Sequence, residues 1–252
     1  MQRRALLKHG GVGLCLLAGC TSRRRETASE PATYFVSPDG SDLGSGTRER
    51  PFGSLTEGLD RAQPGDTVHA LPGRYTEPTR TVRGGRPDAS ITITGPPDAV
   101  FSADGPFEIN HSHVHLKGLT FDGLHRPSTP EDPTAYSESI LQVNESLYER
   151  IKNGRWSGEP VPDDEYLTDV VVKPHAIGNC RADLIKVHWS RNVEIGAFRV
   201  IGPAGVKYLY GNESGHNGEI VYLGNPPGKG YPVDNTRDVH VHHIDNIAGH
   251  PH

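Results

Sequence analysis

Two short segments of the sequence, Asp183–Val187 and Glu219–Leu223, follow one pattern, and each begins with an acid. If one turn of a repeating structure separates them, their backbones stack at the spacing of paired strands, about 4.8 Å. Two adjacent carboxylates require a cation or a shared proton. Asp183 and Glu219 are therefore candidate metal ligands. The alternative interpretation is that both end turns by accepting hydrogen bonds from backbone N–H groups.

The densest polar run in the chain, from Asn212 to Glu219, directly precedes the second of these segments. Its two glycines would let a ligand approach the backbone closely. The run predicts a sugar-binding loop, with Asn212, Asn217 and the following Tyr222 as substrate-binding candidates. His216 is the acid–base candidate by residue type. An ordinary polar insertion between strands would have the same composition.

Histidines alternate along two further segments. His111, His113 and His115 would share one face of a strand, and His240 and His242 repeat the pattern later in the chain. Imidazole is the commonest metal ligand, so a metal site is one interpretation. Because the alternation places apolar residues on the other side of each strand, a solvated outer face is the second interpretation.

The composition excludes several classes of protein. The chain has 252 residues with 30 glycines and 21 prolines but no Gly-X-Y period, which excludes collagen and favours short strands joined by many turns. The formal net charge of −5 argues against a basic surface for nucleic acid. No stretch reaches the roughly 20 apolar residues of a membrane span.

The first residues resemble an export signal. Arg3-Arg4 followed by an apolar stretch resembles the twin-arginine motif, and Leu17–Cys20 resembles a lipobox, in which Cys20 carries the lipid. We therefore expect an export signal over residues 1–19 and a flexible tether over residues 20–33. The expected location is the cell surface, where the chain would be extracellular and attached to the membrane only through its lipid anchor.

A repeat becomes visible after residue 110, where four segments carry valine in the same slot, at Val114, Val170, Val193 and Val239. The interval is 23 residues from Val170 to Val193 and 46 from Val193 to Val239. A period in the low twenties carried by short β-rich units is typical of a solenoid. We interpret the doubled interval as one coil with two insertions, because Pro226-Pro227-Gly228 is incompatible with a central strand.

Two short helices are predicted around this repeat. Ser54 and Glu57 form a capping box that predicts a helix ending near Ala62. The Pro-rich segment 126–165 interrupts the repeat, and the pattern Ser139–Gln142 predicts a surface helix inserted there. Thr67–Leu71 and Ile91–Thr94 are expected to be strands.

The ordered domain, residues 34–252, resembles the right-handed parallel β-helix proteins of the pectate-lyase-like superfamily. Three segments carry the likeness: the opening from YFVSPDGSDLGSGT to LPGRYTE, then SITITG, then HVHLKGLTFDG. The arrangement from Gly84-Gly85-Arg86 to Phe121-Asp-Gly123 is most similar to the alginate lyase and chondroitinase B branch. The resemblance implies an all-β solenoid whose N-terminal end is covered by the helix at Ser54–Ala62.

The resemblance also implies a chemistry. In such lyases calcium held by acids neutralises a uronate carboxylate, and a nearby Lys or Arg takes the adjacent proton. Asp183 and Glu219 would hold the calcium here, and Lys186 or Arg181 would supply the base. We expect an exported, lipid-anchored lyase that acts on acidic polysaccharide, hydrolysis being the less favoured chemistry. The alternative is a non-catalytic, adhesin-like module that binds glycan, which would be favoured if Asp183 and Lys186 faced different sides.

The end of the sequence raises a further expectation. The last repeat, Asp238–Gly249, still follows the coil pattern, and three residues follow it. A solenoid end exposes apolar core and an unpaired strand edge unless it is covered. We expect either that further coils are missing or that a partner or the loop 202–217 covers this end.

Overall fold

The computed structural model describes residues 30–155, 160–206, 218–225 and 229–246, and all elements below lie within the unit Pro31–His252. The predicted export signal, Cys20 and most of the predicted tether lie outside these residues. Order begins with β1 at Thr33, next to the predicted start at Tyr34. Within the described ranges, no helix has the length and apolar character needed to cross a membrane.

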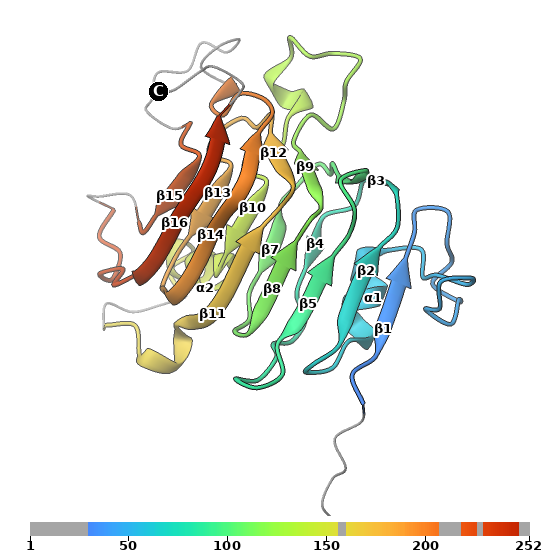
Figure 1. Ribbon diagram of the computed structural model, residues 1–252. Helices are drawn as coiled ribbons and strands as arrows, with labels where there is room; N and C mark the ends of the chain where they lie inside the picture. The colour runs from blue at the N-terminus through green and yellow to red at the C-terminus, as the bar shows by residue number, and fades with distance from the viewer. Residues whose placement is uncertain (1–29, 156–159, 207–217, 226–228, 247–252) are drawn as a thin grey trace, which may run out of the picture. The chain divides into compact units, whose positions relative to one another are not determined.

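The strands form three rows (Figure 1). The first row contains β1 (Thr33–Val36), β2 (Thr67–Ala70), β5 (Ile91–Thr94), β8 (Val114–Lys117), β11 (Leu167–Lys173), the first part of β14 (Ser190–Val200) and β16 (Arg237–Asn246). The second contains β3 (Gly73–Tyr75), β6 (Ala99–Phe101), β9 (Thr120–Asp122), β12 (Ala176–Gly178) and the last part of β14. The third contains β4 (Thr79–Arg80), β7 (Phe107–Ile109), β10 (Leu141–Val143), β13 (Ile185–Val187) and β15 (Val221–Leu223).

The chain visits these rows in a fixed order. From β2 to β3 to β4 it completes one coil, and it repeats the circuit through β5, β8 and β11. Every pairing between these strands is parallel. The protein is therefore a parallel β-helix, as the sequence predicted.

The register confirms the predicted repeat. Val114 pairs with Val170, Val170 with Val193, and Val193 with Val239, so the four valines form one column. Because β14 pairs directly with β16, the interval of 46 residues is a single coil. Its additional length lies in the segments before and after β15, where insertions were predicted.

The core consists of the inward side chains of all three rows. Phe101 and Phe121 come from the second row and Phe107 from the third, and their rings meet at centroid distances of 5.4–5.8 Å. All three side chains are fully buried. These rings therefore join two rows of the β-helix at its centre.

Helix α1 (Leu55–Arg61) has the predicted cap, because Ser54 accepts a hydrogen bond from the backbone N–H of Glu57 at 3.1 Å. Leu55 and Leu59 are buried in the same core as the first strands. The helix packs against β1 and β2 at the N-terminal end of the solenoid (Figure 1).

The segment 126–165 contains the predicted inserted helix, but the helix begins later than predicted. The pattern Ser139–Gln142 does not begin a helix, because Leu141–Val143 forms strand β10 between β7 and β13. The helix of this segment, α2 (Glu145–Lys152), begins after Asn144, whose φ is 62° and whose side chain makes no cap hydrogen bond. The remainder contains two short 3-10 turns, η1 (Pro133–Ala135) and η2 (Asp163–Glu165).

A stacked turn follows the second row of strands. Gly123 and Gly202 occupy positions equivalent to Asn179 in neighbouring coils. A Cβ atom at Gly123 would lie 2.0 Å from the Asn179 carbonyl oxygen, and one at Gly202 would lie 1.9 Å from Asn179 Oδ1. Gly123 must be glycine because the clash would be with backbone, whereas at Gly202 the clash would be with the Asn179 side chain. Segments of very different length leave this turn, namely 124–140, 180–184 and 203–220.

Candidate functional site

The outward residues of the third row form a polar strip. Glu108 on β7, Gln142 on β10, Lys186 on β13 and Tyr222 on β15 are neighbours by strand register. Outward positions of a strand are free of the core and available for binding. Two of the sequence candidates, Lys186 and Tyr222, therefore lie directly side by side.

Asp183 lies at the start of this strip, immediately before β13. Its side chain is 3% exposed, and Oδ1 accepts hydrogen bonds from the backbone N–H groups of Gly218 at 3.0 Å and Glu219 at 3.1 Å. Asp183 thus holds together the turns of two neighbouring coils, which is the structural role considered as the alternative. This role accounts for Oδ1, whereas Oδ2 faces Lys186.

Glu219 completes the predicted acidic pair. A hydrogen bond from Glu219 to Asp183 is the main cause that raises the pKa of Glu219, with burial adding to the effect. Burial acts to raise the pKa of Asp183, but hydrogen bonds from Glu219 and from the N–H of Gly218 hold it below its ordinary value. When the pair takes up a proton, Glu219 is therefore expected to bind it before Asp183 does, as for adjacent carboxylates.

Lys186 faces the same side as this pair, since its Nζ lies 3.6 Å from Asp183 Oδ2. The condition that would have favoured a non-catalytic module, Asp183 and Lys186 on different faces, is not met. Arg181 has a different partner, because its Nη1 lies 3.5 Å from Glu138 Oε2 in the segment 124–140. The structure thus joins Lys186 to the acidic pair and places Arg181 beside Glu138.

The remaining sequence candidates divide into two groups. Burial raises the pKa of Tyr222, and the charges of Asp183 and Glu219 add to the effect, so Tyr222 belongs to the cluster. Asn212, His216 and Asn217 lie outside the described residues. The described part of the candidate site therefore consists of Asp183, Lys186, Glu219 and Tyr222.

Two buried residues close to the candidate site, Glu145 and His188, were not predicted. His188 is 2% exposed, and its ring stacks on Tyr148 at a centroid distance of 4.4 Å. Its Nε2 lies 3.9 Å from Glu145 Oε2, and its Nδ1 lies 3.9 Å from Asp234 Oδ2. Burial raises the pKa of Glu145 to about 7 and lowers the pKa of His188 to about 4. Between these values both side chains are neutral, side by side under the first turn of α2.

Two sequence signals could have revealed His188 and Asp234. His188 follows Lys186 by two residues, the spacing of side chains on one side of a strand. Asp234 follows His188 by 46 residues, the interval that separates equivalent positions in these two coils. Asp234 also repeats the role of Asp183, because it accepts hydrogen bonds from the backbone N–H groups of Trp189 and Thr236, each at 3.0 Å.

The substitution Glu145→Gln is expected to remove a pH dependence of stability. Because burial raises the pKa of Glu145 from 4.5 to about 7, the folded state binds the proton more tightly, and the free energy of unfolding falls as pH rises through this range. The loss amounts to about 3 kcal/mol at 1.36 kcal/mol per pH unit. Glutamine stays neutral, so the variant should gain stability relative to the wild type between pH 5 and pH 8 in urea unfolding.

The half-exposed Glu149 on the same helix provides the control. Glu149→Gln should change the pH dependence much less than Glu145→Gln, because the charge of Glu149 contributes less than burial to the raised pKa of Glu145. Comparison of variant with wild type at each pH cancels the contribution of His188, whose lowered pKa changes stability in the opposite direction. An equal stability difference at pH 5 and pH 8 would contradict the prediction.

The three alternating histidines do not share one face. His111 Nδ1 lies 2.8 Å from the hydroxyl of Thr81, whereas His113 and His115 both contact the carboxylate of Asp169, at 2.9 and 3.3 Å. His113 has φ of 58°, outside the extended region, so the regular alternation fails at this residue. The outer-face interpretation holds for His115, while His111 belongs to the turn before β8.

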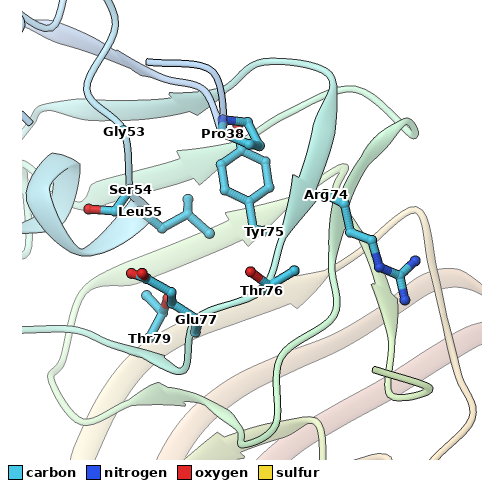
Figure 2. Close-up of a pocket in the computed structure, with 9 residues that line it drawn as sticks. All are labelled: Pro38, Gly53, Ser54, Leu55, Arg74, Tyr75, Thr76, Glu77 and Thr79. Carbon is cyan, nitrogen blue, oxygen red and sulfur yellow. The ribbon is translucent and has the colours of Figure 1, made fainter. Parts of the chain in front are cut away.

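A small cavity of about 150 Å³ lies between the start of α1 and β3 (Figure 2). Ser54, Leu55, Tyr75 and Thr79 contribute to its walls. The Tyr75 hydroxyl is already engaged, donating to the backbone carbonyl of Leu71 at 2.8 Å. This cavity lies in the first coil, whereas Lys186 lies in the fourth.

Comparison with known proteins is consistent with this fold. No protein-family model matches the chain. Over 121 residues the chain is 30% identical to Pectate lyase PEL9 of Emericella nidulans, a match that covers 46% of this chain. This chain is a parallel β-helix similar to a pectate lyase. The match spans 26% of that curated protein, about a quarter of its length.

Among solved structures, a rhamnogalacturonan lyase matches with a TM-score of 0.49 and 14% sequence identity. The match covers 77% of this chain and 50% of that chain.

Proposed function

We propose that this chain acts on an acidic polysaccharide as a lyase that cleaves by β-elimination, at the outer side of the third row of strands. The observation that supports this best is the placement of Lys186, 3.6 Å from Asp183 and directly beside Tyr222. The similarity to a pectate lyase over 121 residues supports the same class of reaction.

β-Elimination consists of three bond changes. A base takes the proton from the carbon next to the uronate carboxylate, the C–O bond to the leaving sugar breaks, and a C=C bond forms. The leaving oxygen takes up a proton from water. Lys186 is the proposed base, since it stands beside Tyr222 on the strip where a sugar chain would lie. Tyr222 offers the neighbouring ring surface on which a sugar can pack.

Asp183 and Glu219 are the residues proposed to hold calcium. Calcium prefers oxygen ligands, and two adjacent carboxylates provide such oxygens. The ion would replace the proton that the raised pKa of Glu219 favours. Calcium takes six to eight oxygens, so water, the substrate or residues outside the described ranges would supply the others. A bound calcium ion would neutralise the uronate carboxylate.

A non-catalytic glycan-binding module is the second candidate function. The observation that favours it is the structural use of Asp183, whose Oδ1 already binds two backbone N–H groups. Export and a lipid anchor at Cys20 remain proposals from the sequence alone. Mass spectrometry of the protein from its own host would test the anchor, with a lipid mass on Cys20 as the expected result.

The function is tested by incubating the full chain with pectate, alginate and glycosaminoglycans and recording the ultraviolet absorbance of the unsaturated product. Absorbance is expected to rise with at least one of these polymers, and to stay flat when EDTA removes calcium. Flat absorbance with all of them would overturn the lyase. Retention of the protein in a gel that contains the same polymers would then support the binding module.

A further inference from the structure

Glu194, His240 and His242 form a cluster on the outer side of the first row, on strands β14 and β16. These two strands lie side by side at one end of the described solenoid (Figure 1). Glu194 pairs with His240 in the register, and Gly196 pairs with His242. One ligand atom from each of Glu194, His240 and His242 can be chosen so that all three lie within 4.8 Å of one another.

We propose that Glu194, His240 and His242 bind a divalent transition-metal ion of the zinc class. Two imidazoles and one carboxylate are ligands that zinc accepts, whereas calcium requires an all-oxygen set. Three protein ligands leave a fourth tetrahedral position for water or an exogenous ligand. This site is independent of the proposed lyase, because it uses different residues on a different row of strands.

The backbone positions His242 toward Glu194. Gly196 has no side chain, and a Cβ atom there would lie 2.1 Å from the His242 carbonyl oxygen and 3.0 Å from His242 Cγ. The two strands approach closely at this point, and His242 Nε2 lies 3.0 Å from Glu194 Oε1. The ring of His240 lies 4.6 Å from that of His242. Because Gly196 carries only a hydrogen atom, Glu194 of one coil and His242 of the next can come close together.

His242 also has the second contact that metal-bound histidines typically make. Its Nδ1 lies 2.7 Å from His243 Nδ1, so one ring nitrogen is held by a neighbour while the other faces Glu194. A hydrogen bond at the remote nitrogen fixes the ring orientation and tautomer of a ligating imidazole. His243 is therefore the positioning residue of the proposed site.

The cluster already holds one cationic side chain, Lys173. Its ammonium lies 2.6 Å from Glu194 Oε1. Lys173 occupies the same oxygen that faces His242, so the ammonium competes with a metal ion for Glu194.

Zinc binding to the full chain is to be measured by isothermal titration calorimetry, with cobalt(II) absorbance as the report on coordination. We expect one zinc ion per chain. The double variant His240→Ala/His242→Ala should weaken binding by more than about 100-fold, and His243→Ala by about 10-fold. Lys173→Met should tighten binding, because it removes the competing charge, an outcome that misfolding cannot produce.

Two controls make the test decisive. His69 stands in the same outward column of the first row of strands as His242, so His69→Ala removes a comparable histidine and should leave zinc affinity unchanged. His250 and His252 lie outside the described residues, so His250→Ala/His252→Ala is measured in parallel. Equal affinity of the wild type and the His240/His242 variant overturns the proposal, as does loss of binding in the His250/His252 variant alone.

Discussion

Replacing Lys186 by alanine is expected to lower the kcat of elimination by about 10²–10⁴-fold, the usual contribution of a positioned general base. Lys186 is the only lysine that the described residues place beside the acidic pair, with its Nζ 3.6 Å from Asp183 Oδ2. Alanine removes the group that accepts the proton and leaves Tyr222 and Glu219 in place. KM should therefore change much less than kcat. The measurement is the initial rate of absorbance increase on whichever uronate polymer the wild type cleaves.

Lys117→Ala is the matched control for this prediction. Lys117 is an exposed, outward-facing lysine on β8 of the first row, so its loss removes the same charge from another side of the solenoid. Its kcat should stay close to that of the wild type. Circular dichroism confirms that both variants fold. A Lys186→Ala enzyme with wild-type kcat would assign the base to another residue.

Replacing Phe107 by alanine is expected to lower the free energy of unfolding by about 3–5 kcal/mol, the cost of removing a buried phenylalanine ring. The side chain is fully buried, and its ring lies 5.5 Å from that of Phe101 and 5.8 Å from that of Phe121. Because these rings join the second and third rows, the cavity cannot close without moving paired strands. Denaturant unfolding of the wild type and the variant measures the difference.

Phe35 offers a comparison within the same fold. It lies on the outward side of β1, with its ring 5.3 Å from that of His69, and it is only partly buried. Phe35→Ala should therefore cost much less than Phe107→Ala. Similar losses for the two variants would show that the aromatic cluster is not a main source of stability.

The repeat could be predicted from the sequence because every coil must place apolar side chains in the same inward slots. This requirement makes the column Val114, Val170, Val193 and Val239 visible without a structure. The pattern Ser139–Gln142 led to a wrong helix start because it is a local signal. Strand pairing with β7 and β13 fixes Leu141 and Val143 instead, and a local pattern does not contain that information.

The candidate site could likewise be predicted from the sequence only in part. Asp183 and Glu219 could be paired from the sequence, because both stand at the same position of successive coils. Glu145 could not be placed, because it comes from a helix outside the repeat that packs over the end of β13. His113 shows a further limit, since a left-handed backbone at a single residue interrupts the strand alternation.

The stacked turn at Gly123, Asn179 and Gly202 separates the repeated part of the chain from the variable part. The backbone is tightly constrained at the turn, yet the segments 124–140 and 180–184 that leave it differ greatly in length while the strands on either side stay in register. The acids of the candidate site stand at the far ends of two such segments, Asp183 in 180–184 and Glu219 in 203–220. Because segment length varies at this edge without a change in strand register, we expect a segment grafted after Asn179 to leave the paired strands intact as long as Asp183 is kept.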